Sequence, residues 1–360
     1  MADNPVWEVA GGGDKGGILV RNGKDLKSEE EKERLSTGAL VRQLELAGGR
    51  LSYVRLTGSG PRRGWVSTKL KDKDLLVLSD KPPPALPVLA VFYSGGFTAV
   101  SGRRTMEPFL KRAREAGFAD AVVLDHVGEP GFEECKDFED YNGRCEAKLD
   151  EDPRCRGRPV AIFAHSHGCV GGYGLARRLG GRCTMLYAVA RRPPDGGLLD
   201  DVWGVDCGAK LASLDDEFVL TRMLDAWPNE MLEPFRNVRP LPEPIKDTIQ
   251  VVKRQYSSSV VPVGSADAPA ICTSGDAPLC TGVRIQAIVA SREQPAGETA
   301  AKMAHWERFS GGAGFSMSTL DSTHMGIMDE KSGLYDFVIN SLLEEAQLAE
   351  KPPSDEPPHA

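Results

Sequence analysis

Ser166 stands in the setting that a nucleophilic serine requires. An apolar run over residues 159–164 leads directly into His165-Ser166-His167-Gly168, and helix-forming sequence follows. A serine on a sharp strand-to-helix turn needs small residues two positions before it and two positions after it. Ala164 and Gly168 occupy these positions, with alanine where glycine is more usual. The pattern predicts that Ser166 is a nucleophile presented on such a turn.

A serine hydroxyl is a weak nucleophile until a base removes its proton, so Ser166 needs a histidine. His165 and His167 flank the serine on the turn, and His305 lies in a predicted helix. His324 directly follows the last predicted strand, in T-L-D-S-T-H-M-G-I-M-D. That loop delivers the base in hydrolases that keep the chain order serine, acid, histidine. We therefore predict that His324 is the base.

The carboxylate that orients the base should follow a strand between the serine and the histidine. The run I-Q-A-I-V-A-S-R-E-Q-P places Glu293 at such a strand exit. Asp321 and Asp329 stand close to His324 in the sequence, which makes them less suitable, and they remain as alternatives. The sequence predicts Glu293 as the orienting acid.

Acyl transfer also needs two backbone N–H groups that face the developing oxyanion. One is expected from His167, the residue after the nucleophile. The other is expected from the loop F-Y-S-G-G-F, at Ser94 and Gly95, where glycine lets the backbone approach a ligand closely. His165 and His167 also match the spacing of an H-x-H metal pair, but no third ligand stands at helical spacing to complete it. The sequence predicts neither a metal nor a cofactor.

The elements that must position these residues follow from an alternation of strand and helix signals. Such an alternation predicts an α/β architecture, a mostly parallel, doubly wound sheet covered by helices on both faces. The predicted strands are residues 88–93, 121–125, 160–164, 184–190, 283–290 and 315–320, and the predicted helices are residues 106–115, 170–179, 299–308 and 334–349.

The chain is expected to contain two domains. Residues 1–80 hold short β-runs separated by glycine-rich or charged turns, which predicts a small β-barrel. A proline-rich linker over residues 81–87 leads to the second domain, residues 88–345. Within it, residues 198–256 carry helical runs without a strand signal, so an inserted helical lid is predicted there. The tail, residues 346–360, is rich in proline and acidic residues and is expected to be disordered.

Two resemblances sharpen this organisation. The pieces G-I-L-V-R-N-G, R-L-S-T-G-A-L-V, R-L-S-Y-V-R-L and G-W-V-S resemble, in this order, a bacterial-type Src-homology-3-like domain. The resemblance covers residues 16–78, and a charged insertion at residues 24–34 replaces that family's short loop. Tyr53 and Trp65 fit either a partly buried core or an aromatic groove for a proline-rich peptide, and the sequence leaves both open.

The second domain resembles a type II thioesterase of the α/β-hydrolase superfamily. The resemblance covers roughly residues 87–343 and implies that Ser166 is the nucleophile and His324 its histidine, with Glu293 where the family has an aspartate. The sequence departs from the family at this glutamate, over residues 128–157, and at Ala164 and His167, where glycine and methionine are usual. The segments that carry the resemblance are V-F-Y-S-G-G-F, A-H-S-H-G-C-V-G-G-Y-G-L-A-R-R-L, M-L-Y-A-V-A-R-R-P-P, L-A-S-L-D-D-E-F, P-I-K-D-T-I-Q-V-V-K-R-Q-Y and residues 306–324.

This resemblance implies a serine hydrolase that cleaves acyl thioesters from the phosphopantetheine arm of an acyl- or peptidyl-carrier protein. Polyketide, nonribosomal peptide and fatty-acid synthesis use such carriers. Two alternatives remain open. A carboxylesterase or lipase would act on oxygen esters with the same residues. A non-catalytic scaffold would use the N-terminal barrel to recruit partners.

Charge and hydropathy limit the partners further. The chain has 44 basic and 52 acidic residues, a net charge of −8, so no broad basic face for nucleic acid is expected. No apolar stretch approaches the ~20 residues of a membrane span. The start, M-A-D-N-P-V-W-E, lacks the basic and apolar regions of a signal peptide. We expect a cytoplasmic protein without a membrane span.

Overall fold

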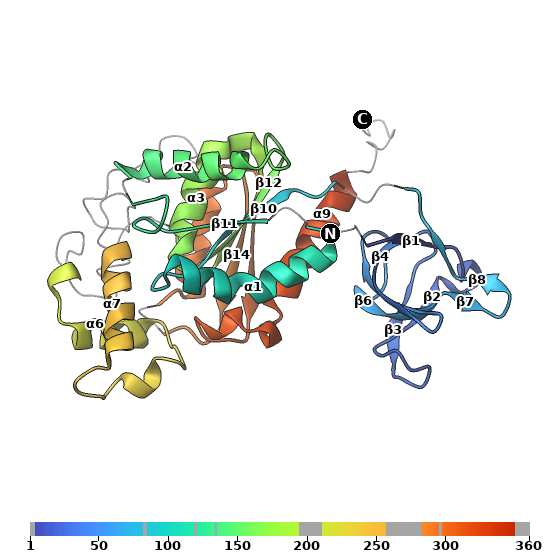
Figure 1. Ribbon diagram of the computed structural model, residues 1–360, viewed down its shortest axis with the longest axis horizontal. Helices are drawn as coiled ribbons and strands as arrows, with labels where there is room; N and C mark the ends of the chain where they lie inside the picture. The colour runs from blue at the N-terminus through green and yellow to red at the C-terminus, as the bar shows by residue number, and fades with distance from the viewer. Residues whose placement is uncertain are drawn as a thin grey trace. The chain divides into compact units, whose positions relative to one another are not determined.

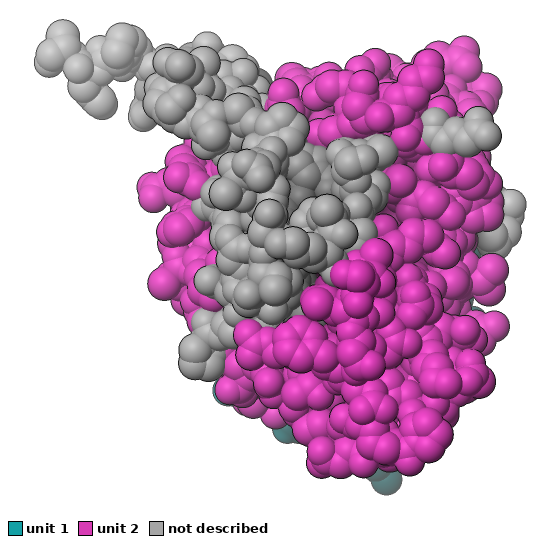
Figure 2. Space-filling model, turned by 90° about the vertical axis from the view of Figure 1, so that its left-hand side faces the viewer, with its two compact units in different colours: residues 1–86, 111–119, 336–360 teal, residues 87–110, 120–335 magenta. Residues whose placement is uncertain are grey.

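The computed structural model of the chain describes residues 4–81, 85–118, 121–133, 135–193, 211–256, 283–294 and 297–349. Figure 1 shows its elements, and Figure 2 colours its two compact units. Unit 1 comprises Met1–Leu86, Lys111–Ala119 and Asp336–Ala360, and unit 2 comprises Pro87–Leu110 and Asp120–Tyr335. The predicted linker prolines at 82–84, the first part of the predicted lid and most of the predicted tail lie outside the described residues.

Unit 1 contains an antiparallel sheet in the order β3-β2-β6-β5-β4-β1-β9. This sheet encloses a core that includes Val20, Leu51 and Val66, as a small barrel domain would. Its strands are β1 (Val6–Val9), β2 (Ile18–Arg21), β3 (Glu30–Leu35), β4 (Leu40–Ala47), β5 (Arg50–Arg55), β6 (Arg63–Ser67) and β9 (Leu76–Leu78), with a separate small hairpin of β7 (Lys69–Leu70) and β8 (Lys73–Asp74).

The charged insertion predicted at residues 24–34 does not remain a loop. Its second half enters β3, which pairs antiparallel with β2 through Ile18 opposite Leu35 and Arg21 opposite Glu30. Leu35 is buried, whereas the rest of β3 is exposed. Backbone pairing with a neighbouring strand therefore outweighs the low β-propensity of this charged run.

The two aromatic residues of the barrel have different surroundings. Tyr53 has no exposed surface, and its hydroxyl donates to the Pro61 carbonyl at 3.0 Å, so it is a core residue. Trp65 is half-buried, with the Lys24 ammonium 5.7 Å from its ring centroid. A groove for proline-rich peptides remains a prediction, and Tyr53 contributes no exposed face to it.

Unit 2 is built on a parallel sheet in the order β11-β10-β12-β13-β14-β15. Every neighbouring pair in this sheet is parallel. Its strands are β10 (Val88–Phe92), β11 (Ala121–Leu124), β12 (Val160–His165), β13 (Cys183–Val189), β14 (Arg284–Ala290) and β15 (Phe315–Leu320). A mostly parallel sheet was predicted from the alternating elements, and this sheet fits an α/β-hydrolase fold.

Helices cover both faces of this sheet (Figure 1). On one face, Ile162 and Ala164 of β12 pack into a core shared with α2 (Phe138–Glu151) and α3 (Gly168–Leu179). On the other face, Phe163 packs against Phe109 of α1 (Ala99–Ala116), with ring centroids 4.4 Å apart. A strand buried on both faces reads as a continuous apolar run, which is why β12 lacks the alternation of a half-exposed strand.

Two of the predicted helices differ clearly from their predicted ranges, and the last one matches. Helix α1 begins at Ala99, seven residues before the predicted start, and continues through Pro108. The predicted helix at 299–308 consists of α8 (Ala300–Met303) followed by a 3-10 segment, Ala304–Phe309. Helix α9 (Leu334–Ala349) has the predicted bounds. In the part of the chain that the structure describes, no helix has both the length and the apolar character that crossing a membrane requires.

Helix α2 was not predicted and fills the segment that departs from the thioesterase family. The Asp137 side chain caps it by accepting the Asp140 N–H at 2.8 Å. Tyr141, Cys145 and Leu149 are buried at helical spacing of four residues. Their spacing is the sequence signal of an amphipathic helix, although charged residues between them dilute it.

The described part of the lid, residues 211–256, contains α6 (Asp216–Ala226), a 3-10 segment at Glu233–Phe235 and α7 (Glu243–Tyr256). These elements share a small core of their own that includes Leu220, Trp227 and Ile249. The Asp215 side chain caps α6 by accepting the N–H groups of Glu217 and Phe218. The described part of the lid is therefore a helical subdomain.

Candidate active site

Ser166 lies on a strained turn between β12 and α3. Its φ of 53° is in the left-handed region, which non-glycine residues rarely adopt. The Ser166 N–H donates to the Val189 carbonyl at 2.9 Å, which fixes the turn to the end of β13. Backbone strain of this kind is typical of a nucleophilic serine that a sharp strand-to-helix turn exposes at the edge of the sheet.

The residues around this turn show why small side chains are needed. A Cβ at Gly168 would stand 2.5 Å from the Tyr93 carbonyl oxygen, so no side chain fits there. Ala164 carries a methyl group where glycine is usual, and α3 presents Gly172 to it. A Cβ at Gly172 would lie 2.8 Å from the Ala164 Cβ. The glycine in the helix thus provides the space that the alanine in the strand occupies.

Ser166, His324 and Glu293 meet at the carboxyl edge of the sheet, where β12, β14 and β15 end. His324 Nε2 lies 2.8 Å from Ser166 Oγ, across 158 positions of sequence. His324 Nδ1 lies 2.7 Å from Glu293 Oε1. The side chains of His324 and Glu293 are 3% and 2% exposed. The relay formed by Ser166, His324 and Glu293 is therefore shielded from water. The structure thus brings all three predicted residues together in the order nucleophile, base and acid.

The two alternative acids lie elsewhere. Asp321 is 90% exposed and pairs with Arg292 at 3.5 Å, and its Oδ1 also accepts from Ser291 Oγ. Asp329 caps a 3-10 turn by accepting the Lys331 N–H at 2.8 Å. Neither carboxylate contacts His324 in the described structure.

The predicted oxyanion residues also lie beside Ser166. A Cβ at Gly95 would stand 2.9 Å from the His167 Cβ, so the loop after β10 touches the residue that follows the nucleophile. The Ser94 carbonyl interacts with His126 Nε2 at 3.1 Å, which orients the peptide group between Ser94 and Gly95. The backbone N–H groups of His167 and Gly95 have no hydrogen-bond partner among the described residues.

His165 connects the loop after β10, which contains Ser94 and Gly95 and is called the oxyanion loop below, to the loop that carries His324. Its Nε2 lies 3.0 Å from the His324 carbonyl, and its Nδ1 lies 2.5 Å from Ser94 Oγ. Burial lowers the pKa of His165 to about 3, so the ring is neutral. Because a carbonyl only accepts, Nε2 carries the hydrogen, and Nδ1 accepts from the Ser94 hydroxyl. No sequence pattern indicated this role for a residue next to the nucleophile.

Because burial lowers the pKa of two histidines, we predict that the folded protein loses stability in mild acid. Burial lowers the pKa of His126 to about 4 and that of His165 to about 3, whereas an unfolded histidine titrates near ~6.5. Below pH ~6.5 the unfolded chain binds protons that the folded chain does not bind, so the free energy of unfolding falls as the pH falls. Each histidine contributes up to about 1.4 kcal/mol per pH unit.

We expect guanidinium unfolding curves to show this decline between pH ~6.5 and ~4. Replacing His165 with glutamine should reduce the slope by about one proton. An unchanged slope in both His165→Gln and His126→Gln would show that these rings do not control acid stability.

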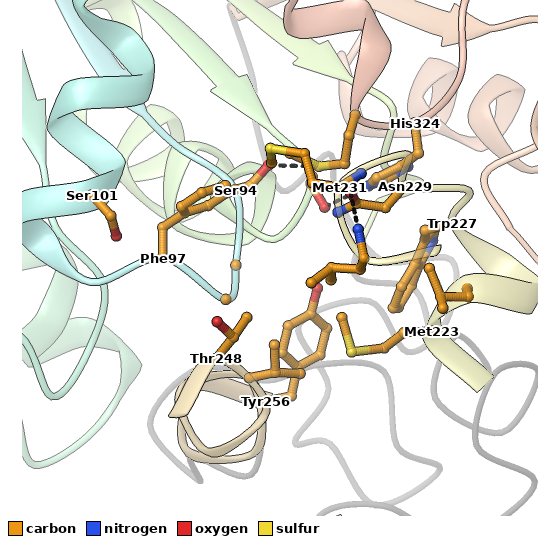
Figure 3. Close-up of a pocket in the computed structure, with 17 residues that line it drawn as sticks. Ser94, Phe97, Ser101, Met223, Trp227, Asn229, Met231, Thr248, Tyr256 and His324 are labelled. Atoms are coloured by element: carbon orange, nitrogen blue, oxygen red, sulfur yellow. Dashed lines mark hydrogen bonds between the residues drawn. The ribbon is translucent and has the colours of Figure 1, made fainter. Parts of the chain in front are cut away.

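An apolar pocket opens beside Ser166 and His324 beneath the lid (Figure 3). Its volume is about 240 Å³. Figure 3 shows Ser94 and Phe97 on one side of it and the lid residues Met223, Trp227 and Tyr256 on the other. The apolar residues that line it are Phe97, Met223, Leu224, Trp227, Met231, Leu232, Val252, Tyr256 and Met325.

The lid is tied to the loops that carry the site. Thr323, next to the base, donates to Glu230 of the lid at 2.9 Å. The Trp227 ring centroid lies 5.7 Å from that of His324. These contacts hold the base loop under the lid, and no sequence pattern indicated them, because they join residues about a hundred positions apart.

The arginine pair after β13 is buried behind the nucleophile. Both the backbone N–H and the side-chain Nε of Arg192 contact Glu298 Oε2, at 2.7 and 3.3 Å, and Glu298 has no exposed surface. The Arg191 side chain extends to Tyr256 of the lid, with Cζ 5.7 Å from the ring centroid. Within the described residues, no group of three or more histidine, cysteine, aspartate or glutamate side chains is arranged to hold a metal ion.

No protein-family profile matches this sequence, and no curated protein matches it. Solved structures with similar folds include the type II thioesterase BorB from the borrelidin biosynthetic cluster, at 17% identity and a TM-score of 0.48. That comparison covers 72% of this chain and 94% of that one. A lipase-esterase related protein from Clostridium acetobutylicum is similar at 13% identity, with a TM-score of 0.46 and coverage of 71% and 95%.

The Cif epoxide hydrolase from Acinetobacter nosocomialis is similar at 14% identity, with a TM-score of 0.45 and coverage of 72% and 83%. These three proteins carry out different reactions, and similarity at this level assigns none of them to this chain. The sheet order, the strained serine between β12 and α3, and the loops that bring Glu293 and His324 to it fit the α/β-hydrolase fold in their own right.

Proposed function

We propose that this protein is a type II thioesterase-like serine hydrolase that releases acyl groups from the phosphopantetheine arm of an acyl- or peptidyl-carrier protein. One observation carries the proposal. The His324 ring bridges Ser166 Oγ and Glu293 Oε1, at 2.8 and 2.7 Å, beside an apolar pocket. The sequence resemblance of residues 87–343 supports the choice of thioesters within the class of serine hydrolases.

The first half of the reaction forms an acyl-serine. His324 Nε2 accepts the Ser166 proton as Oγ attacks the thioester carbonyl carbon, and Glu293 stabilises the imidazolium that results. The backbone N–H groups of His167 and Gly95 hold the oxyanion. When the tetrahedral intermediate collapses, the carbon–sulfur bond breaks, and the thiolate of the carrier arm receives the proton from His324.

The second half releases the acid. A water molecule gives its proton to His324 Nε2 and attacks the acyl carbonyl, and a second tetrahedral intermediate forms in the same oxyanion hole. Its collapse breaks the bond to Ser166 Oγ, which takes the proton back from His324. The free acid leaves, and the three residues return to their starting protonation states.

The pocket supports an apolar acyl group as the substrate. It combines nine apolar or aromatic side chains with six polar ones, which are Ser94, Ser101, Ser166, Asn229, Thr248 and His324. The five cysteines in the described part of the chain are free thiols, as in a reducing compartment. A cytoplasmic location for the reaction and its carrier-protein partner is part of this proposal.

Medium-length acyl thioesters should be better substrates than acetyl or charged ones. Each buried methylene contributes about 0.8 kcal/mol, roughly fourfold in kcat/KM. We expect octanoyl-N-acetylcysteamine to exceed the acetyl analogue by at least about tenfold, and the succinyl analogue, whose carboxylate would enter the apolar pocket, to be poorest. Equal kcat/KM values across this series would show that the pocket does not hold the acyl group.

A matched pair tests the choice of sulfur over oxygen. The octanoyl thioester of N-acetylcysteamine should be cleaved faster than the corresponding oxygen ester, and octanoyl loaded on a carrier protein faster than either. A preference for the oxygen ester would identify a carboxylesterase instead. Cleavage of the free thioester without any gain from the carrier would remove the carrier protein from the proposal.

A further inference from the structure

Tyr256, the last residue of the lid helix α7, lies directly over the nucleophilic turn. It is 4% exposed, and its ring stacks on His167 with centroids 4.2 Å apart and an interplanar angle of 27°. Its hydroxyl oxygen lies 3.3 Å from the position that a Cβ would take at Gly95. The phenol therefore contacts both residues whose backbone N–H groups face the oxyanion in the proposed reaction.

The Tyr256 hydroxyl has two polar neighbours, Ser166 and Arg191. Burial raises the pKa of the phenol, and the positive charge of Arg191 opposes that rise without cancelling it, so the phenol stays neutral at physiological pH. A guanidinium has no acceptor, so the phenol O–H cannot donate to Arg191 and is left for an oxygen acceptor such as Ser166 Oγ. The Ser166 hydroxyl hydrogen then remains available for His324 Nε2, 2.8 Å away.

Arg191 strengthens the phenol as a donor. Its side chain is almost fully buried, at 2% exposure. Two of its nitrogens, Nε and one terminal nitrogen, have no hydrogen-bond partner among the described residues. A positive charge beside a hydroxyl makes its O–H a stronger donor, and Arg191 Cζ lies 5.7 Å from the Tyr256 ring centroid. Arg191 thus polarises the O–H of Tyr256 without taking its proton.

The end of α7 is fastened to the oxyanion loop. The Gln255 side chain accepts the Gly96 N–H at 2.7 Å and donates to the Phe97 carbonyl at 3.0 Å, and it is 1% exposed. The preceding residue, Arg254, pairs with Glu129 at 2.8 Å. Two successive residues of the lid therefore hold Tyr256 in register with the backbone around Gly95.

We propose that Tyr256 is a further catalytic residue, whose hydroxyl donates a hydrogen bond to the oxyanion beside the N–H groups of His167 and Gly95, with Arg191 as its positioning residue. In the resting enzyme the O–H points to Ser166 Oγ. When Oγ attacks, the negative charge develops on the neighbouring carbonyl oxygen, and the O–H turns to it. No proton is transferred. This inference rests on the proposed acyl-transfer function.

The lid then takes part in the chemistry as well as covering the pocket. An acyl group that lifts α7 away from the loop after β10 removes one of three oxyanion donors, whereas one that fits beneath the lid keeps all three. The fit of the acyl group in the apolar pocket therefore changes kcat as well as the binding affinity.

The variant Tyr256→Phe tests this inference because it keeps the ring stacked on His167 and removes only the hydroxyl. We expect kcat on octanoyl-N-acetylcysteamine to fall by about 10²-fold, the effect of losing one oxyanion donor, with KM changed less than about threefold. Tyr53→Phe is the matched control. It removes a fully buried tyrosine hydroxyl that donates to the Pro61 carbonyl at 3.0 Å in the N-terminal barrel, and it should leave kcat unchanged.

Rates are referred to active sites titrated with a fluorophosphonate, so that misfolded protein does not count. An alkyl boronate that forms a tetrahedral adduct with Ser166 supplies a second readout. Its affinity should fall with Tyr256→Phe by about the same factor as kcat, because both report the oxyanion. A purely structural tyrosine would lower the melting temperature and leave both values unchanged.

The two proposals fail in different ways. If the wild type hydrolyses the thioester and is labelled at Ser166 while Tyr256→Phe retains full kcat and boronate affinity, Tyr256 is no oxyanion donor and the serine hydrolase stands. If the wild type neither turns over acyl substrates nor reacts with the fluorophosphonate, the proposed function fails, and the role of Tyr256 falls with it.

Discussion

Replacing Ser166 with alanine should abolish hydrolysis of acyl thioesters and lower kcat by about 10⁶-fold, the loss seen when a serine nucleophile is removed. The variant keeps the His324–Glu293 contact but has no Oγ to form the acyl intermediate. The measurement is turnover of octanoyl-N-acetylcysteamine, followed by release of the free thiol.

The matched control is Ser291→Ala. Ser291 is exposed, follows β14 and bonds to Asp321, so its loss leaves the relay intact. We expect wild-type turnover from this variant. Wild-type turnover from Ser166→Ala would overturn the assignment of the nucleophile.

Replacing Glu293 with glutamine should have the second-largest effect, about 10⁴-fold in kcat, as for the carboxylate-to-amide change in a comparable relay. The carboxylate accepts from His324 Nδ1, which keeps Nε2 free of hydrogen and able to take the Ser166 proton. A glutamine amide can instead donate to Nδ1. The ring would then carry its hydrogen on Nε2, where it cannot act as the base.

Asp321→Asn supplies the control, because Asp321 was the alternative acid nearest His324 in the sequence and lies exposed beside Arg292. We expect its kcat to match the wild type. A large loss in Asp321→Asn with full activity in Glu293→Gln would exchange the roles of the two carboxylates. Thiol release under saturating substrate, with each variant shown to be folded by circular dichroism, decides between them.

The residues of the relay were within reach of sequence analysis because each follows a predicted strand of the sheet. The runs that form β12 and β14 are mostly apolar and buried, whereas β15, at the edge of the sheet, is F-S-M-S-T-L with no fully buried residue, and polar or glycine-containing loops follow all three strands. Parallel strands bring their carboxyl ends to one edge. Ser166, Glu293 and His324 therefore had to lie near one another once the sheet was predicted.

Other features depend on contacts that a linear pattern does not contain. Tyr256 and Arg191 are separated by 65 positions, and only packing of the lid places the phenol against the guanidinium. His165 received no role in the sequence analysis beyond flanking the serine on the turn, whereas the structure places it between Ser94 and the His324 carbonyl. Helix α2 was not predicted because charged residues separate its buried residues Tyr141, Cys145 and Leu149 in the sequence.

The space around Ala164 shows the same dependence on tertiary structure. An alanine in the first small position weakens the sequence motif, and in the fold it is matched by Gly172 on the facing turn of α3. The departure from the usual motif is therefore compensated by packing, which a comparison of the five motif residues alone does not reveal.

The central claim is that Ser166 forms a covalent acyl intermediate with the help of His324. Its most direct test is to treat the folded protein with an alkyl fluorophosphonate and locate the adduct by peptide mass spectrometry. We predict one adduct, on Ser166, in the wild type, and labelling that is strongly slowed in His324→Ala. An unlabelled Ser166 in folded protein would contradict the claim and favour a scaffold that has kept the hydrolase fold without its chemistry.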